Sequence, residues 1–451
     1  MSNKIFQSLP AGSSSFTEIR KEGCYYVDKT PYLKTVFSKE SSTDKTSSLA
    51  GSPVLLFTRP RRFGKTLLMN MFEAFLKIDS HNPGDTTLHN QLFHGTKITE
   101  DKAFCEKYMG KFPVICITLK NVFGKNFNIA YSKLAEIVAS KALEFSFLKD
   151  SKALDDDDRD TYSKISSKSY LKNADDDVAQ SYATSAIKDL SLMLYKHFRQ
   201  PVYILIDEYD VPLENAYSRG FYDEMMGFIR SLFESALKTN PYLEKGIITG
   251  CLRISKESIF TGLNNLKVQS ILSSHYSECF GFTEDEVKEI LDYYGFADKY
   301  PEVREWYDGY MFGKTEIYNP WSILSYIDEA QGEGGFTPAA RPYWSNTSSN
   351  SIVKELIYEA DNKTRSDLEM LMSGGTIAKP VHEDITYGDI HSNQDNLWNF
   401  LFFTGYLKMK STYTDDGTVY LELAIPNKEV REIYKRTIRG WFDEKISNTD
   451  N

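Results

Sequence analysis

Two short segments of the sequence carry residues that could act together on a phosphate group. The first is Gly64-Lys65-Thr66, which lies between the apolar run Val54–Phe57 and the amphipathic stretch Leu67–Leu76. Backbone N–H groups at a helix N-terminus bind phosphate oxygens, and Gly64 lets the backbone approach them closely. Lys65 can reach the β and γ phosphates, and Thr66 can place its hydroxyl on Mg²⁺. This order of strand, tight loop and helix predicts a phosphate-binding loop.

The second segment places two carboxylates at the end of another apolar run. Val202–Ile206 is followed directly by Asp207 and Glu208. Asp207 would orient a metal-bound water opposite Thr66, and Glu208 would polarise the attacking water of a hydrolysis reaction. An acidic strand end that caps the next helix is the plainer interpretation, but it does not account for the Gly-Lys-Thr upstream. The two half-motifs, in this order, predict Mg²⁺-dependent binding and hydrolysis of a nucleoside triphosphate.

Three further polar residues near these segments are candidates for smaller roles. Thr249 ends the apolar run Gly246–Thr249, where it could sense the γ-phosphate, and Arg253 is near enough in the chain to add charge. A strand end with a surface arginine explains these two residues equally well. Asp210 is expected to cap the next segment rather than to bind a metal.

The elements that must position these residues alternate along the chain. The apolar runs are short and continuous, which is typical of strands covered on both faces of a parallel sheet; they are Val54–Phe57, Val114–Leu119, Val202–Ile206 and Gly246–Thr249. Helical patterns lie between them, at Leu67–Leu76, about Asn126–Phe147, Thr184–Phe198 and Phe221–Leu237. This order predicts an α/β fold with a parallel sheet flanked by helices.

After about residue 280 the pattern becomes mostly helical. Thr283-Glu-Asp-Glu286 forms a capping box for a helix that Gly295 would end. Leu397–Leu407 and Lys428–Trp441 are also helical, and Val419–Ile425 between them is predicted to be a strand. We therefore expect a nucleotide-binding domain, a helical lid with a small winged-type region, and a tail, over residues 1–280, 281–445 and 446–451.

Two polar segments are predicted to be surface insertions in the first domain. Lys39–Ser52 is rich in Ser, Thr, Lys and Gly, and Ser151–Tyr182 carries two acidic runs. Neither run has the glycine and the spaced oxygen ligands of a calcium loop, so a solvated, mobile loop is expected there.

The composition limits the classes of protein and partner. The 451 residues include 53 basic and 63 acidic side chains, a formal net charge of −10. This charge gives no overall attraction to nucleic acid, and the clearest basic cluster, Arg59, Arg61, Arg62 and Lys65, is better explained by ATP phosphates. The five cysteines form no C-x-x-C pair, which argues against a disulfide framework or a zinc site. Without a secretory signal or a membrane span, a soluble cytoplasmic protein is expected.

Seven motifs are spread over most of the chain: Leu9–Gly12 with Phe16, Tyr26–Thr30, Arg59–Thr66, Ile206–Asp210, Trp306–Tyr310, Tyr318–Trp321 and Tyr343–Thr347. Together they resemble the AAA-ATPase-like family of P-loop proteins, whose members often carry a PD-(D/E)XK nuclease-like domain on their C-terminal side. The usual phosphate loop starts with a glycine where this sequence has Arg59, and the run Arg59–Lys65 is similar to the family's own version of the loop.

The resemblance implies an AAA-like ATPase that binds ATP and Mg²⁺. Asp28, within Tyr26–Thr30, would then lie near the adenine and ribose. The plainer interpretation of that segment is a short strand followed by Thr30 as N-cap and Pro31 at the first helical position. No Asn-Lys-x-Asp pattern of guanine recognition is present, which favours ATP. The loop residues expected to contact the nucleotide are Arg61, Arg62, Phe63, Gly64, Lys65, Thr66 and Leu67.

Two alternatives to an active ATPase remain. One is a nucleotide-gated protein-interaction module with little turnover, in which C-terminal aromatic residues such as Trp306 and Trp321 contact a partner. The other is the ATPase partner of a nuclease-type activity on nucleic acid. The Glu-x-Lys triplets Glu100–Lys102 and Glu286–Lys288 do not lie on a strand with an upstream aspartate, so the nuclease-like half itself is expected to be absent.

Overall fold

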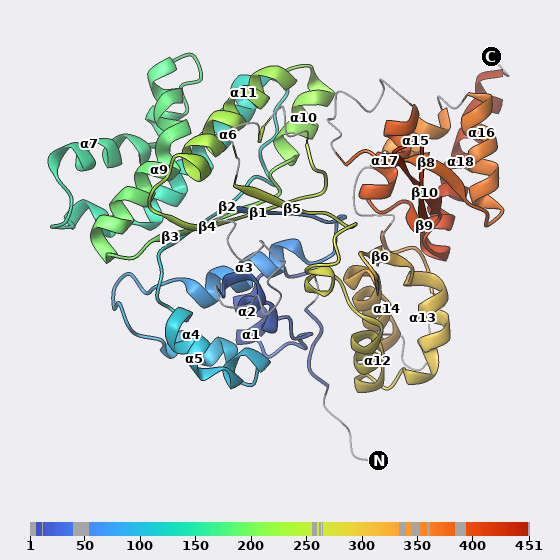
Figure 1. Cartoon of the computed structure of the whole chain (residues 1–451), viewed down its shortest axis with the longest axis horizontal. Coiled ribbons are helices and arrows are strands. Elements are labelled where there is room, and N and C mark those ends of the chain that lie inside the picture. Colours follow the sequence, from blue (N-terminus) through green and yellow to red (C-terminus); the bar gives the residue numbers. More distant parts are fainter. Residues whose placement is uncertain are drawn as a thin grey trace.

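The computed structural model describes an α/β region followed by a mixed C-terminal region (Figure 1). The described residues are 6–10, 12–38, 54–254, 259, 260, 263, 265–332, 340–344, 351–358, 361–383 and 394–449. The expected insertion Lys39–Ser52 lies outside them, and so do Ala11 and the Ser345–Thr347 part of the last motif.

The central sheet has five parallel strands in the order β2-β3-β4-β1-β5. Every residue of β1 and β3 is buried, which accounts for their continuous apolar runs. The predicted parallel sheet is confirmed, although β5 was not expected because three of its four residues are only half-buried. The strands are β1 (Val54–Thr58), β2 (Val114–Thr118), β3 (Val202–Asp207), β4 (Leu243–Gly250) and β5 (Leu266–Gln269).

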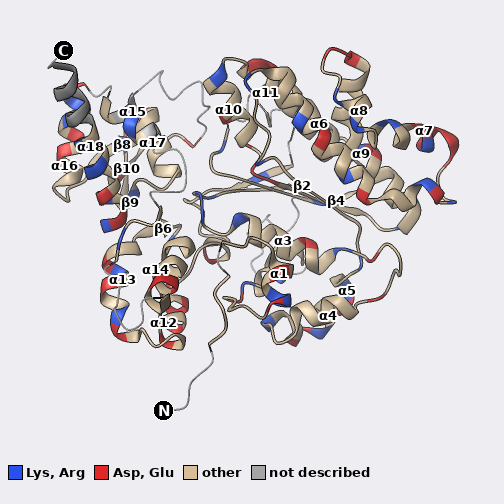
Figure 2. Ribbon diagram, turned by 180° about the vertical axis from the view of Figure 1, so that it is seen from behind, with Lys and Arg blue, Asp and Glu red and all other residues tan. Residues whose placement is uncertain are grey.

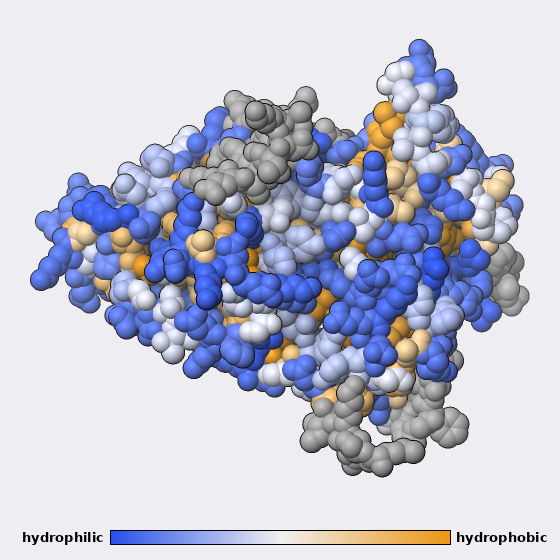
Figure 3. Space-filling view, turned by 60° about the horizontal axis from the view of Figure 1, so that its bottom comes forward, coloured by the Kyte–Doolittle hydropathy of each residue, from blue (hydrophilic) through white to orange (hydrophobic). Residues whose placement is uncertain are grey.

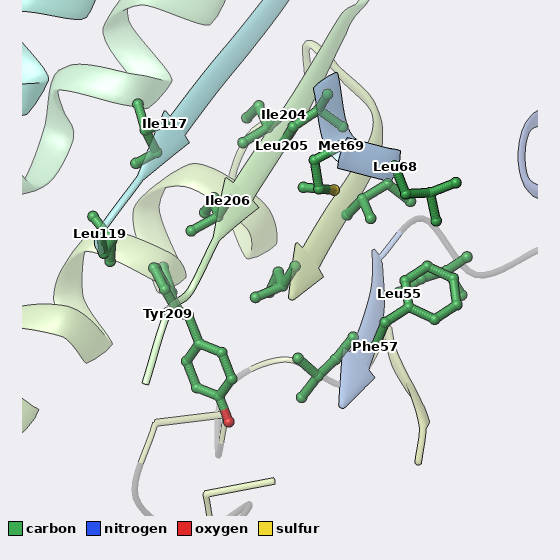
Figure 4. Close-up of a cluster of buried hydrophobic side chains, with 14 of the residues drawn as sticks. Leu55, Phe57, Leu68, Met69, Ile117, Leu119, Ile204, Leu205, Ile206 and Tyr209 are labelled. Carbon is green, nitrogen blue, oxygen red and sulfur yellow. The ribbon is translucent and has the colours of Figure 1, made fainter. Parts of the chain in front are cut away.

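Helices cover both faces of this sheet (Figure 1). One face carries α1 (Phe16–Lys21), α2 (Pro31–Phe37), α3 (Lys65–Leu76), α4 (Thr87–Phe93) and α5 (Lys102–Tyr108). The other carries α6 (Phe127–Glu144), α9 (Asp177–Phe198), α10 (Val211–Arg219) and α11 (Tyr222–Phe233). Apolar side chains of β1, β2, β3 and α3 fill the core between the layers (Figure 4). The site residues therefore stand on a rigid framework.

The prediction of a mobile loop over Ser151–Tyr182 is wrong. The segment forms two short helices, α7 (Asp156–Ile165) and α8 (Lys168–Leu171), and the start of α9. Asp155 and Asp158 make a capping box at the N-terminus of α7, and both accept hydrogen bonds from Lys196. The acidic run thus stabilises a helix end. The helices bury the apolar side chains Tyr162, Ile165 and Leu171.

The C-terminal region mixes helices with two small sheets. Its helices are α12 (Glu284–Tyr293), α13 (Tyr300–Tyr307), α14 (Pro320–Gly332), α15 (Ser351–Tyr358), α16 (Asn362–Met372), α17 (Gln394–Phe403) and α18 (Lys428–Thr449). The strands β6 (Tyr310–Phe312) and β7 (Thr315–Ile317) form a hairpin, and β8 (Ile377–Pro380), β9 (Lys408–Asp415) and β10 (Thr418–Ala424) form an antiparallel sheet of order β8-β10-β9.

Several expectations for this region are met and others are not. The capping box of Thr283 and Glu286 opens α12, and Gly295 follows its end with φ +83°. Of the C-terminal strands only β10 was expected, because β9 is polar and largely exposed. Helix α18 continues past Trp441 into the residues assigned to a tail. The expected domain boundary near residue 280 stays a prediction, since one hydrophobic core runs from the sheet into this region.

The surface is predominantly polar. Both acidic and basic residues occur along the outer helices (Figure 2), and the face shown in Figure 3 is mostly hydrophilic, with scattered apolar residues. No helix among the described residues combines the length and the apolar character that a membrane crossing requires.

Candidate functional site

The loop predicted to bind phosphate connects β1 to α3 at the carboxyl edge of the parallel sheet. Strand β1 ends at Thr58, and α3 begins at Lys65 with Gly64 at its N-cap position. Gly64 has φ +85° and Arg62 has φ +71°, a region that residues with a Cβ rarely adopt. Ligands of open α/β folds bind at this edge, where the strands point.

Lys65 is held inside the loop. Its Nζ donates hydrogen bonds to the carbonyl oxygens of Arg59 and Pro60, both at 3.1 Å, and lies 3.6 Å from Oε1 of Glu208. Burial opposes the charge, but the surrounding acidic groups, including Cys251, Glu208 and the two nearby aspartates, raise the pKa of Lys65 above its usual range. The ammonium is therefore charged and stands where phosphate oxygens could replace the carbonyls.

Asp207 joins three elements at the bottom of the site. Its Oδ2 accepts a 2.7 Å hydrogen bond from the Thr66 hydroxyl, and its Oδ1 accepts one from the Thr249 hydroxyl. Burial, together with the neighbouring Glu208, raises the pKa of Asp207. Within the described chain no group of three or more His, Cys, Asp and Glu side chains could hold a metal. A metal here would therefore need oxygens from a ligand or water besides Thr66 and Asp207, as Mg²⁺ sites with phosphates have.

Glu208 follows β3 in a strained conformation. Its φ of +54° lies in the left-handed region, which is costly for a residue with a Cβ. The side chain is 17% exposed and points toward the Lys65 ammonium. Lys65, Thr66, Asp207, Glu208 and Thr249 are thus brought together from three parts of the chain.

Arg59, which replaces the usual first glycine of the loop, anchors the loop in the protein. Its guanidinium is fully buried and donates to the carbonyl oxygens of Thr58 at 2.9 Å and Gln269 at 2.7 Å. The Cζ atom lies 5.2 and 5.0 Å from the ring centroids of Phe280 and Phe312. These contacts direct the side chain toward β5 and the C-terminal region.

The other loop side chains also contact surrounding elements. The Arg61 guanidinium lies 2.5 Å from a carboxylate oxygen of Glu214 in α10. The Arg62 guanidinium lies 4.3 Å from the ring of Trp321. The buried Phe63 ring is 4.9 Å from the Tyr310 ring and 5.2 Å from the Phe312 ring. Contact of these three residues with a nucleotide stays a prediction.

The Asp28 carboxylate connects the start of α2 to the segment around Lys97. Its Oδ1 accepts from the backbone N–H and the hydroxyl of Thr30, and its Oδ2 accepts from the Lys97 backbone N–H at 2.7 Å. The expected short strand before Thr30 is not formed, and the Thr30 side chain does not cap α2, although Pro31 is its first residue. Thr30 does occupy the predicted N-cap position, but its hydroxyl donates to Asp28 and accepts from the Ile98 backbone N–H instead of capping the helix.

Arg253 points toward the C-terminal region, where its Nη1 lies 3.7 Å from Oε2 of Glu383. A role for Arg253 at the phosphate site stays a prediction.

Asp210 is a buried acidic residue whose role was not foreseen. It stands at the N-cap position of α10, but its side chain does not cap the helix. Its Oδ2 accepts from the backbone N–H groups of Cys251 at 2.7 Å and Leu252 at 3.1 Å, which fixes the turn after β4. Its Oδ1 is buried and has no hydrogen-bond partner. Burial, and then the charge of Glu208, raises the pKa of Asp210 to about 6.

An apolar cavity of about 80 Å³ adjoins the loop. It lies between the segment that precedes α2, the first turn of α3 and the C-terminal region, with Lys29 at its wall. The Lys29 ammonium donates to the Glu278 carbonyl at 2.8 Å and to Glu286 at 2.7 Å. Apolar lining is contributed by Tyr26, Val27, Phe63, Leu67, Phe282 and Leu324. An aromatic ring system could enter here beside the loop.

Comparisons with known proteins agree with this arrangement. A family model described as a predicted AAA-ATPase matches residues 10–260. The chain is also 24% identical over 433 residues to an uncharacterized protein in the vnfD 5′ region of Azotobacter chroococcum mcd 1, which covers 94% of this chain and 68% of that protein. No solved structure matches the chain.

Proposed function

The chain belongs to the AAA-ATPase-like family, and on that premise we propose that it binds ATP with Mg²⁺ and hydrolyses it. The observation that carries the proposal is the hydrogen bond between Thr66 and Asp207. These residues are 141 positions apart, yet their side-chain oxygens lie 2.7 Å from each other beside the Lys65 ammonium. Such a pair of oxygen ligands next to a lysine is the arrangement that phosphoryl transfer from a metal-bound triphosphate needs.

Lys65 and the loop backbone hold the phosphates in this proposal. The ammonium exchanges the carbonyl oxygens of Arg59 and Pro60 for oxygens of the β and γ phosphates. Free N–H groups at the start of α3 add partial positive charge. Gly64 keeps the approach open, since nothing lies within 4 Å of the position its Cβ would take.

Thr66 and Asp207 are the protein ligands of Mg²⁺, with Thr249 orienting Asp207 from the neighbouring strand. The ion, when bound, supplies positive charge that neutralises the phosphate oxygens. Hard oxygen donors of this kind suit Mg²⁺.

Glu208 orients and polarises the attacking water. In the structure its carboxylate faces Lys65 at 3.6 Å, and phosphates bound to Lys65 would free it to accept a hydrogen bond from water. Its strained backbone fixes the carboxylate at the strand end, so the group is positioned before the substrate arrives.

The apolar cavity beside Phe63 and Leu67 is the site of the adenine ring in this proposal. The base would enter between Tyr26 and the C-terminal region, which both line the cavity. Asp28 then supports this wall through its bonds to Thr30 and Lys97 rather than by contacting the ribose.

The test compares ATP affinity and hydrolysis, both with Mg²⁺, in the wild type, Lys65→Ala and Glu208→Gln. Lys65→Ala should weaken ATP binding about tenfold or more. Glu208→Gln should bind ATP as the wild type does and lose about 100-fold or more in turnover, the contribution expected of a general base. Lys120→Ala, at an exposed lysine, serves as the charge control and should change neither quantity. Equal ATP binding by all variants, or by none, would contradict the proposal.

A second candidate function is a nucleotide-gated interaction module with slow turnover. It is favoured by two contacts between the phosphate loop and aromatic residues of the C-terminal region. Arg62 packs on Trp321, and Phe63 packs on Tyr310. Nucleotide binding could then change the surface that this region offers to a partner. A partner-dependent rise in hydrolysis would support it, whereas rapid hydrolysis by the isolated protein would argue against it.

A further inference from the structure

A second cleft, of about 490 Å³, lies in the C-terminal region and is separate from the phosphate loop. It opens between α13, the first residue of β9 and the segment that precedes α18. Its lining includes Asp308 and Gly309, which belong to the motif Trp306–Tyr310. The proposed ATPase reaction gives this motif no role.

Gly309 lines the cleft, and the Lys408 side chain packs closely against it. Its φ is +98°, and a Cβ built on it would lie 2.3 Å from the Pro426 carbonyl oxygen and 2.8 Å from the Lys408 ammonium. Only glycine therefore allows the lysine nitrogen to come so close to the backbone. The turn is fixed by Asn427, whose side-chain amide donates to the Asp308 carbonyl at 2.8 Å.

Lys408 differs from the buried lysines of the chain. Each of those has an acceptor: Lys29 pairs with Glu286, Lys65 with loop carbonyls, Lys245 with the Val36 carbonyl and Lys379 with Asp367. Lys408 is half-buried, and no described residue offers its ammonium a hydrogen bond within 3.5 Å or a carboxylate within 4.0 Å. Burial lowers its pKa, and Asp308 and Glu316 counter this only from a longer distance. A partly desolvated charge without a partner is unfavourable, so an anion would be stabilised beside it.

A second cation lines the same cleft. The Arg304 side chain of α13 is 55% exposed, and its Nε lies 3.5 Å from Oδ2 of Asp308. The remaining acidic residue of the lining, Glu305, is compensated from outside the cleft by Lys428 at 3.3 Å. Among the residues that line the cleft, Lys408 is therefore the charged side chain without an oppositely charged partner within 4.0 Å in the described chain.

We propose that this cleft binds a small organic oxyanion, through a carboxylate or phosphate group held by Lys408 and Arg304. Both groups offer the oxygens that an ammonium and a planar guanidinium recognise. The volume lies within the range of small-molecule sites. The site is independent of the proposed ATP hydrolysis, because none of its residues contributes to the phosphate loop.

The test measures binding of inorganic phosphate and of succinate to the full chain by calorimetry, at constant ionic strength. At least one probe should bind, and its affinity should fall about tenfold or more in Lys408→Met and in Arg304→Met, since each removes a charged partner. Lys410→Met, at the exposed lysine two residues along β9, is the matched control. Lys65→Ala reports separately on any phosphate bound at the loop.

Binding of phosphate alone would identify a phosphorylated ligand, and binding of succinate alone a carboxylic acid; both results support the site if Lys410→Met and Lys65→Ala retain the affinity. Binding that is lost in Lys65→Ala but kept in Lys408→Met would place the anion at the loop and overturn the proposal. The absence of binding by either probe would overturn it as well. If Lys408→Met fails to fold, Arg304→Met decides alone, because it alters an exposed side chain.

Discussion

At the scale of single residues, the candidate site is a group of buried charges that compensate one another. Lys65 lies among Asp207, Glu208 and Asp210; its charge lowers the pKa of each aspartate, while burial and the charge of Glu208 raise it. Asp210 is buried, and one of its carboxylate oxygens has no hydrogen-bond partner. Its protonation should therefore be visible in the stability of the protein.

Replacing Asp210 with Asn should flatten the dependence of stability on pH. The pKa of Asp210 is raised from 3.8 to about 6 in the folded state, so the native protein binds this proton more tightly than the unfolded chain does. The stabilisation is complete below about pH 4 and is lost as the pH rises to about 6. Between pH 4 and 7 the free energy of unfolding of Asp210→Asn should therefore fall by about 2 kcal/mol less than that of the wild type.

Urea denaturation at a series of pH values measures this difference. Asn keeps an oxygen that can accept from Cys251 and Leu252, so the variant should fold. Glu224→Gln, at an exposed acidic residue of α11, controls for the loss of one carboxylate. Parallel pH profiles for Asp210→Asn and the wild type would contradict the prediction, because they would mean that Asp210 has the same pKa in the folded and unfolded protein.

At the scale of elements, the site depends on how closely β4 approaches the segment after β3. Gly250 ends β4, and a Cβ there would lie 2.5 Å from a ring carbon of Tyr209 and 2.9 Å from Oδ1 of Asp210. The Tyr209 hydroxyl in turn donates to the Leu252 carbonyl at 2.7 Å. Residue 250 must therefore be glycine, because a Cβ at this position would overlap Tyr209 and Asp210.

Gly250→Ala should lower the free energy of unfolding by about 1–3 kcal/mol, because the methyl group overpacks a buried contact. Gly227→Ala is the matched control, since Gly227 is exposed in α11 and nothing lies within 4 Å of its Cβ position. That control should be neutral or stabilising by up to about 1 kcal/mol, because alanine favours the helix. Urea denaturation of both variants gives the comparison, and equal effects would contradict the close packing described for Gly250.

At the scale of the whole molecule, the phosphate loop is also the surface on which the C-terminal region packs. Pro60 lies against Gly405, where a Cβ would come within 3.1 Å of the proline ring. Phe63 packs on the hairpin β6–β7 through Tyr310 and Phe312. A change in the loop cannot leave these contacts unaffected, because packed interfaces have little free volume.

Hydrogen exchange should detect this coupling. Addition of Mg²⁺ and ATP to Glu208→Gln should slow amide exchange in residues 58–66 and also in residues 310–321. Lys65→Ala should show neither change. Slower exchange confined to the loop would mean that the C-terminal region does not respond to the nucleotide, which would remove the basis of the gated-module alternative.

Local patterns predicted the buried strands of the central sheet and missed strands that are polar and partly exposed. The runs that became β1 to β4 stand out because several consecutive residues are apolar, as strands covered on both faces require. Strand β5 and strand β9 are partly exposed and carry polar residues, so no such run marks them. The helix α7 was mistaken for a loop because its acidic residues cap the helix and pair with Lys196, a contact 38 residues away.

The order of residues along the chain is enough to predict that Gly64-Lys65-Thr66 follows a strand and opens a helix, and that Asp207 and Glu208 end another strand. These are local properties, set by the apolar periodicity and by residues adjacent in the chain. The tertiary structure decided which of them meet. The sheet order places β4 between β3 and β1, so Thr249 comes to stand beside Asp207 while Thr66 reaches its other oxygen. Strand order depends on contacts between distant segments, and no local pattern encodes it.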